Sequence, residues 1–261
     1  QSTLILSGWR GSIAHGMYIE NHIDDKDVIG VVIPPLAWYL GYAPAFTGDR
    51  AFPTNGTKEI KHNEFDIVIY ELRKMIALLA QGNPNVLSLL WLQPNHYLKK
   101  TFPGAMLTEK RSPFACKHVY HSFNGYAYAQ MHKMTHQAYE GYMGEKRKQL
   151  VDKFGYDTKN AAHLVRLLRM GIEFLTEGEL HVFREDAPQL LDIKKAERTL
   201  EHGQAEADRL FKRTEEAYIR SPLPARCDPM VLHKLTMQIF EAYFGRSLAT
   251  YSRVEATDDQ A

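Results

Sequence analysis

The sequence predicts an α+β fold, with a small mixed sheet and its helices first and a mostly helical C-terminal region after them. Three observations predict it. Up to Tyr70, short apolar stretches alternate with turns rich in glycine, proline and polar residues, which is typical of strands. From Glu71 onward, apolar residues recur at spacings of three and four, the period of an amphipathic helix. The chain has 261 residues and is 44% hydrophobic, so it can bury a sizeable core.

The expected strands come first in the chain. A buried strand at Leu4–Leu6 runs into a glycine-rich turn at Gly8–Ser12. A second strand, Val28–Ile33, stops at the two prolines that follow it, because proline lacks the amide donor that a strand ladder needs. Two more strands, Thr57–Lys61 and Phe65–Tyr70, are joined by a polar turn, and the latter shows the two-residue alternation of a pleated strand.

Helices are expected from Glu71 on. The first ends at Gly82, a residue type that commonly terminates helices. Asn83 and Pro84 then favour a new helix, because asparagine caps the first turn and proline fits it without losing a hydrogen bond. Further helical patterns cover Ala115–His136, Glu145–Phe154, Thr158–Thr176, Lys194–Tyr218 and Pro229–Phe244. Leu36–Gly56 lacks clear periodicity, and we expect it to be an ordered loop that covers a site.

Composition and charge exclude several classes of protein. The formal net charge is +1, from 32 basic and 31 acidic residues, so any contact with nucleic acid must come from local clusters. The two cysteines, Cys116 and Cys227, lie far apart in the chain, which argues against a disulfide framework and favours a reducing, cytoplasmic location. The longest apolar runs, such as Val86–Leu92, are far shorter than a bilayer span.

Three aspartates carry the strongest chemical signal. Asp25 and Asp27 open the second strand, where residues two apart point to one face of a sheet, and a neighbouring strand can bring Asp66 to the same face. Carboxylates this close repel one another unless a hard cation neutralises them, and such oxygen ligands suit Mg²⁺ or Mn²⁺. We therefore expect all three to be metal-binding and catalytic. Glu64 is an alternative to Asp66, or a supplement to it, because the two residues share a strand face.

A glycine-serine turn precedes these carboxylates. Gly11 lets the backbone approach a phosphate, and Ser12 adds a hydroxyl donor. Together with the aspartates, this turn predicts phosphoryl chemistry on an NTP. Two cations held by Asp25 and Asp27 would bind the triphosphate, while Asp66 would help the second cation to activate an attacking hydroxyl.

The same segments resemble a known family. Residues Gly11–Pro35, GSIAHGMYIENHIDDKDVIGVVIPP, resemble the opening motif of polymerase β-type nucleotidyltransferases, in which Gly-Ser precedes two aspartates separated by one residue. Four further segments resemble the RlaP family, the polymerase β-like proteins linked with RNA repair: DIVIYELRKMIALLAQGNPNVLSLLWL, FNGYAYAQMHK, KNAAHLVRLLRMGIEFLTEGEL and LLDIKK. The similarity extends from about Gly8 to about Leu235.

The resemblance implies an architecture and an activity. It implies a polymerase β-type nucleotidyltransferase core at residues 1–110, a helical region at 111–250 that completes the active site, and a polar tail at 251–261. The implied enzyme is a metal-dependent nucleotidyltransferase that moves an NMP from an NTP, such as ATP, to a hydroxyl group on RNA and releases pyrophosphate. Nucleotidylation of a protein or a small molecule is the alternative activity. A non-catalytic nucleotide-binding module is a third reading, which the intact set of carboxylates disfavours.

Basic residues of the expected helix 158–176 form a second part of the site. Lys159, His163 and Arg166 fall on one stripe of that helix, where they can bind a triphosphate or a nucleic-acid backbone. A solvated helix face is the alternative, and the resemblance of KNAAHLVRLLR to the RlaP family favours binding. Lys194, within LLDIKK, is a candidate on the same ground. A further basic and aromatic group that can contact a strand end comprises Lys117, His118, His121, Tyr126, Gln130 and Lys133.

Overall fold

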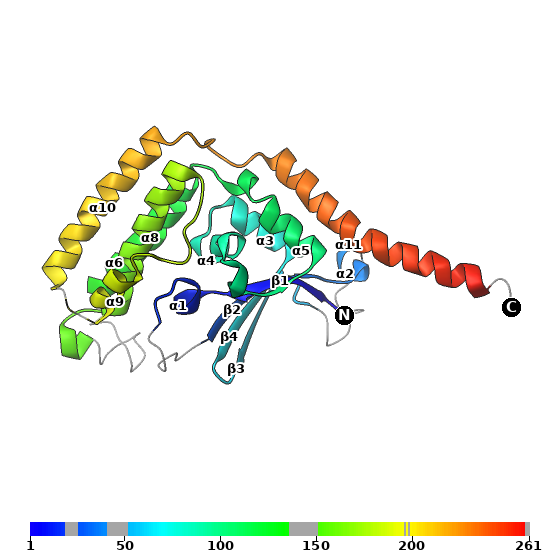
Figure 1. The fold of residues 1–261 in the computed structure, drawn as a ribbon, viewed down its shortest axis with the longest axis horizontal. Helices are drawn as coiled ribbons and strands as arrows, with labels where there is room; N and C mark the ends of the chain where they lie inside the picture. The colour runs from blue at the N-terminus through cyan, green and yellow to red at the C-terminus, as the bar shows by residue number, and fades with distance from the viewer. Residues whose placement is uncertain (19–25, 41–51, 136–150, 196, 198, 259–261) are drawn as a thin grey trace.

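The computed structural model describes residues 1–18, 26–40, 52–135, 151–195, 197 and 199–258 (Figure 1). Their fold is α+β, as predicted: a mixed sheet is formed by the first part of the chain and helices follow it. The strands are β1 (Thr3–Trp9), β2 (Lys26–Ile33), β3 (Thr57–His62), β4 (Phe65–Glu71) and β5 (Tyr97–Lys100). They lie side by side in the order β3-β4-β2-β1-β5.

The central pair of strands is parallel, and the other pairs are antiparallel. β2 and β4 run in the same direction, with Asp27 opposite Asp66 and Val31 opposite Tyr70. β1 pairs with β2 and with β5, and β3 pairs with β4. Val28–Ile33 is an apolar run in the middle of the sheet, and its apolar side chains are buried on both faces. Register partners point to one face, so this pairing brings the two aspartates together.

Helices cover one face of the sheet and extend beyond it (Figure 1). The α-helices are α1 (Gly11–Ala14), α2 (Leu36–Leu40), α3 (Leu72–Ala80), α4 (Pro84–Leu87), α5 (Phe102–Glu109), α6 (Val119–Thr135), α8 (Thr158–Glu177), α9 (Ala187–Lys194), α10 (Leu200–Arg220) and α11 (Pro229–Asp258). Short 3₁₀ turns are η2 (Ser88–Trp91), η3 (Pro94–His96) and η4 (Ser112–Phe114). α3 and α5 pack on the sheet, and α8 is packed between α6, α9 and α10.

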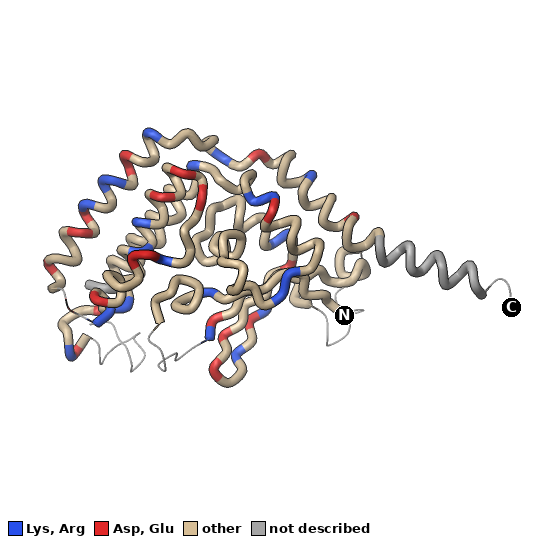
Figure 2. Tube along the Cα trace, in the orientation of Figure 1, with Lys and Arg blue, Asp and Glu red and all other residues tan. Residues whose placement is uncertain are grey.

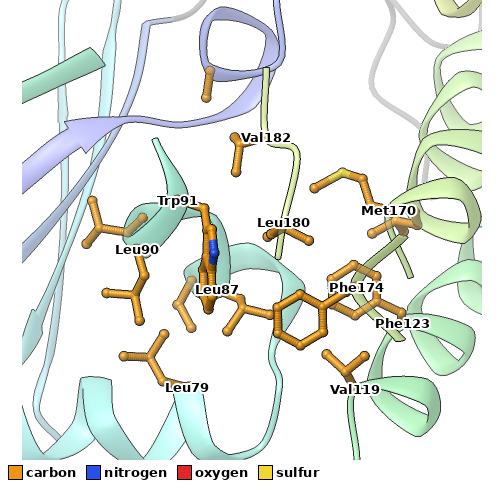
Figure 3. Close-up of a cluster of buried hydrophobic side chains, with 14 of the residues drawn as sticks. Leu79, Leu87, Leu90, Trp91, Val119, Phe123, Met170, Phe174, Leu180 and Val182 are labelled. Carbon is orange, nitrogen blue, oxygen red and sulfur yellow. The ribbon is translucent and has the colours of Figure 1, made fainter. Parts of the chain in front are cut away.

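One hydrophobic core joins the sheet to the later helices (Figure 3). Trp91 of η2 meets Phe174 of α8 edge to face, with ring centroids 5.4 Å apart and planes at 83°. Leu79 of α3 and Phe123 of α6 are fully buried in the same cluster. Burial of a large apolar side chain contributes about 1.5–3 kcal/mol. Because the core is shared, residues from the sheet and from α8 keep fixed positions relative to each other.

All four predicted strands are present. β2, β3 and β4 are slightly longer than predicted, whereas β1 has seven residues instead of three and includes Gly8 and Trp9 of the expected turn. The start of α4 is also confirmed, because the Asn83 side chain accepts a hydrogen bond from the Asn85 N–H at 2.9 Å. A helix beginning at Lys194 is wrong. Lys194 ends α9, and α10 begins only at Leu200, where the Thr199 hydroxyl caps the first turn by accepting from the His202 N–H at 3.3 Å.

Other predictions are met only in part. The sequence did not predict β5, a short strand at the sheet edge with mostly exposed residues and no clear alternation. The expected loop at 36–56 begins with the short helix α2, and its residues 41–51 lie outside the described ranges. In the expected helix 145–154, residues 151–154 are described and helical. The backbone of α11 continues as helix to Asp258, within the expected polar tail. Among the described residues, no helix has the length and apolar character needed to span a membrane.

Candidate active site

Asp27 and Asp66 lie side by side at one end of the parallel strand pair. They are register partners on β2 and β4, so their carboxylates point to the same face of the sheet. The guanidinium of Arg10, just after β1, lies between them: Nη2 is 3.5 Å from Asp27 Oδ1 and 3.6 Å from Asp66 Oδ1. The Arg10 backbone N–H also donates to the Asp27 carbonyl at 2.9 Å. Arg10 thus bridges two adjacent carboxylates on one face of the sheet, and adjacent carboxylates are ligands that suit a hard metal ion.

Gly11 brings the backbone directly against Asp27. Its φ of +63° lies in the left-handed region, which glycine adopts without steric cost. A Cβ atom at this position would lie 2.3 Å from Asp27 Oδ2, so any side chain would collide with the carboxylate. Ser12 follows in α1, and its carbonyl accepts a hydrogen bond from the Met17 N–H at 2.9 Å. The Gly-Ser turn therefore lies beside the aspartates, where a phosphate-binding turn can serve a metal site.

A pocket of about 250 Å³ opens beside Asp27. Its walls come from the turn after β1, from β2, from the α4 region and from α8, so segments far apart in the sequence form it together. The pocket is lined by Arg10, Gly11, His15, Asp27, Pro84, Asn85, Ser88, His163, Arg166 and Leu167. The structure therefore brings together four of the residues that the sequence singled out: Gly11, Asp27, His163 and Arg166.

His15 and Arg166 contact each other in this pocket. His15 is buried, with Nδ1 2.8 Å from the Val182 carbonyl and Nε2 2.7 Å from Arg166 Nη1. A carbonyl only accepts and a guanidinium only donates, so Nδ1 carries the proton and Nε2 accepts from Arg166. Burial, reinforced by the charge of Arg166, lowers the pKa of His15 well below its usual value and keeps the ring neutral. Burial likewise lowers the pKa of Arg166, and the nearby charge of Arg184 adds to this effect.

Two other arginines fix the segment that lies behind His15. Arg184 donates to Glu173 Oε1 at 2.8 Å and to Asp186 Oδ1 at 2.7 Å. Arg169 donates to the same Asp186 carboxylate at 2.6 Å. The backbone N–H of Arg184 donates to the His15 carbonyl at 3.2 Å. This charged network holds the segment that follows α8 against His15, so the position of the imidazole is well determined.

Lys159 and Lys194 are not among the residues that line the pocket. Lys159 is exposed in the first turn of α8, and Lys194 is the last residue of α9. The Thr158 hydroxyl donates to the Lys194 carbonyl at 2.9 Å, so the two lysines belong to the same end of the helical region. Arg166 lies about two helical turns farther along α8. Helical spacing predicts that Lys159 and Arg166 lie on the same face of α8, but only the part of that face that carries Arg166 lines the pocket.

Asp25 lies outside the described residues. Glu64 is described, and its carboxylate accepts from Lys26 Nζ at 3.1 Å. Lys26 precedes Asp27 in β2, so its side chain points to the opposite face of the sheet. The expectation that Glu64 shares a strand face with Asp66 does not hold, because Glu64 is not part of a strand. Strand alternation does not apply to Glu64, because it belongs to the turn before β4.

The described donor set suits a hard cation bound together with substrate. Within the part of the chain that the structure describes, no three His, Cys, Asp or Glu side chains gather as a metal site. Asp27 and Asp66 supply two adjacent carboxylates, and Mg²⁺ is often bound by one or two carboxylates plus substrate phosphates. Arg10 Nε is buried and has no hydrogen-bond partner in the described structure. These residues therefore fit a divalent cation.

Arg10 and His15 contribute contacts that the sequence did not predict. Arg10 directly precedes the Gly-Ser turn, and a basic residue next to a phosphate-binding turn is a usable signal. His15 lies in the same short run, but its partners are 167 and 151 residues away in the chain. No local pattern predicts such contacts.

Charged residues outside the pocket are mixed in sign. Figure 2 shows basic and acidic residues alternating along α10 and over the neighbouring helices, in agreement with the net charge of +1. Two members of the Lys117–Lys133 group have structural roles: the Tyr126 hydroxyl accepts from the Asn83 side chain at 3.3 Å, and Gln130 is buried. The pocket beside Asp27 is therefore the better candidate site.

Comparison with known proteins adds a family match. The model of a family described as RlaP, the RNA repair pathway DNA polymerase beta family, matches residues 1–220. This range includes every residue that lines the pocket. No curated protein and no solved structure matches the chain.

Proposed function

The chain belongs to the RlaP family of DNA polymerase β-like proteins, and from this premise we propose that it is a metal-dependent nucleotidyltransferase that acts on RNA. It moves an NMP from an NTP to a hydroxyl group of the RNA and releases pyrophosphate. The observation that supports the proposal best is the pairing of Asp27 with Asp66 across β2 and β4, beside the Gly11-Ser12 turn. By its place in the sequence, Asp25 is the proposed third carboxylate.

Each part of the site has a proposed task. The aspartate carboxylates hold Mg²⁺ or Mn²⁺, which supplies Lewis-acid polarisation of the α-phosphate when bound. Gly11 permits the close approach of the backbone, and Ser12 adds a donor for a phosphate oxygen. His163 and Arg166, which line the same pocket, supply further donors for the triphosphate.

The proposed reaction is a displacement at the α-phosphorus. The acceptor hydroxyl oxygen forms a bond to phosphorus while the bond between phosphorus and the bridging oxygen of the β-phosphate breaks. The bonding pair leaves with pyrophosphate, and the hydroxyl proton passes to a base, for which Asp66 is the proposed residue. Lys159 and Lys194, at the end of the helical region, are proposed contacts for the RNA backbone.

Labelled nucleotides test the proposal. The protein is incubated with Mg²⁺ or Mn²⁺, each α-labelled NTP in turn, and RNA, DNA or lysate protein as the acceptor. We expect label on RNA, and a loss of at least about a hundredfold in Asp27→Ala and Asp66→Ala, because each removes a charge that the transition state needs. Glu59→Ala is the matched control: it removes an exposed carboxylate from β3 of the same sheet and should leave the rate unchanged.

Each failure of this experiment has a distinct meaning. Unchanged incorporation in both aspartate variants would contradict the enzymatic part of the proposal. Label on protein or on a small molecule alone would contradict the RNA part and support nucleotidylation of another acceptor. If the acceptor is RNA, its binding should also weaken steeply with salt, because phosphate contacts release counterions.

A further inference from the structure

Three arginines of the helical region differ in their partners. Arg169 is paired with Asp186 and Glu206, and Arg184 is paired with Glu173 and Asp186. The described residues give Arg166 no carboxylate partner. Its Nη1 instead contacts the neutral His15 Nε2 at 2.7 Å and Met170 Sδ at 3.2 Å.

A partly buried guanidinium without a carboxylate is unusual, because a buried charge is normally paired. Carboxylates are present nearby, but Glu173 and Asp186 are engaged by Arg184 and Arg169. Arg166 also lines the pocket that contains Gly11 and Asp27. The positive charge of Arg166 is thus available to an anion that enters the pocket from outside the protein.

His15 is suited to hold Arg166 without cancelling its charge. Its Nδ1–H is committed to the Val182 carbonyl, so Nε2 has only a lone pair to offer. A carboxylate in this place would neutralise the guanidinium and compete with a phosphate, whereas a lysine would repel it. The neutral imidazole accepts one N–H of Arg166 and leaves the remaining donors of the guanidinium for a ligand.

We infer that His15 is a positioning residue, which holds Arg166 as the binding group for the β- and γ-phosphates of the NTP and for the pyrophosphate product. The inference rests on the proposed function for the identity of the polyphosphate. The anion site itself does not depend on turnover. Gly11 and Asp27 line the same pocket as Arg166, so a polyphosphate bound to Arg166 shares this pocket with the proposed metal-binding carboxylate.

Binding of inorganic pyrophosphate tests the inference without any transfer reaction. Pyrophosphate with Mg²⁺ is titrated into the full chain in a calorimeter. We expect Arg166→Gln to weaken binding by about tenfold to a hundredfold, the range for loss of a charge-assisted contact. His15→Leu, which removes the acceptor but not the charge, should weaken binding by roughly tenfold. Arg213→Gln is the control, because it removes an exposed cation from α10, away from the pocket.

Kinetics separate a positioning role from a structural one. In His15→Leu the KM for the NTP should rise more than kcat falls, and His15→Asn, which keeps a side-chain acceptor, should recover part of the affinity. Unfolding by urea identifies a variant that has simply lost its fold. Pyrophosphate binding that is absent in the unmodified protein, or equal in Arg166→Gln and the unmodified protein, would overturn the inference. Arg166-dependent pyrophosphate binding without any NMP transfer would support it and contradict the proposed function instead.

Discussion

Substitution of Gly11 by alanine should remove activity while leaving most of the fold intact. The new Cβ would lie 2.3 Å from Asp27 Oδ2, and contacts under 3.0 Å are essentially never observed, so the carboxylate oxygen has to move by roughly 0.7 Å. Metal–ligand distances tolerate changes of only about 0.2 Å. A misplacement of this order at a reacting centre costs about a hundredfold in rate. The positive φ adds backbone strain of about 1–2 kcal/mol.

The matched control for this prediction is Gly155→Ala. Gly155 has a φ of +80°, but a Cβ there meets no atom within 4 Å, so the variant has the backbone strain without the collision. Urea unfolding should show similar losses of stability in the two variants, and transfer of labelled nucleotide should be lost only in Gly11→Ala. Wild-type rates in a folded Gly11→Ala protein would refute the reasoning, because the position of the Asp27 carboxylate would then not matter.

Other changes test separate parts of the structure. Burial holds the pKa of His15 below its usual 6.5, so the unfolded chain binds a proton there that the folded protein does not. The free energy of unfolding should therefore fall as the pH drops below about 6.5, and His15→Gln should reduce this dependence in urea titrations. The Sγ atoms of Cys116 and Cys227 lie 3.2 Å apart, so diamide, which takes up the two thiol hydrogens, should join them as a disulfide. Mass spectrometry of unreduced peptides detects the link, and Cys116→Ser should abolish it. Phe174→Ala should lower the free energy of unfolding by about 3–5 kcal/mol, because Phe174 is fully buried against Trp91; circular dichroism in denaturant measures the loss.

The parts of the fold that the sequence predicts are those with local causes. β2 is identified by the continuous apolar run Val28–Ile33, and β4 by its two-residue alternation. Side-chain alternation also predicts which face Asp27 occupies once the strand is placed. The position of Asp66 beside Asp27 needs one further fact, the parallel register of β2 with β4, which the sequence alone does not determine.

The remaining features depend on contacts between distant segments. β5 is a strand only because β1 offers it an edge, and its four residues carry too little pattern to show this. The contact between His15 and Arg166 depends on how α8 packs against the turn after β1. Glu64 was assigned to a strand, although it lies in the turn before β4, because the end of that turn cannot be located from alternation. In each case a tertiary contact decides the structure, and local sequence preferences are too weak to predict that contact.

The sequence points most clearly to the site where a residue breaks the pattern that predicts its strand. Apart from Lys26 and Asp27 at its start, β2 is apolar, so an acid at this position serves no purpose in the core. The pairing with Asp66 then adds a second negative charge to the same face. Arg10 lies 3.5 and 3.6 Å from the two carboxylates, longer than a charge-assisted hydrogen bond of about 2.8 Å. Two like charges on one face of the sheet, with Asp27 lining a pocket, are a local conflict of the kind that proteins keep at functional sites, and this supports the proposed metal-binding role of the pair.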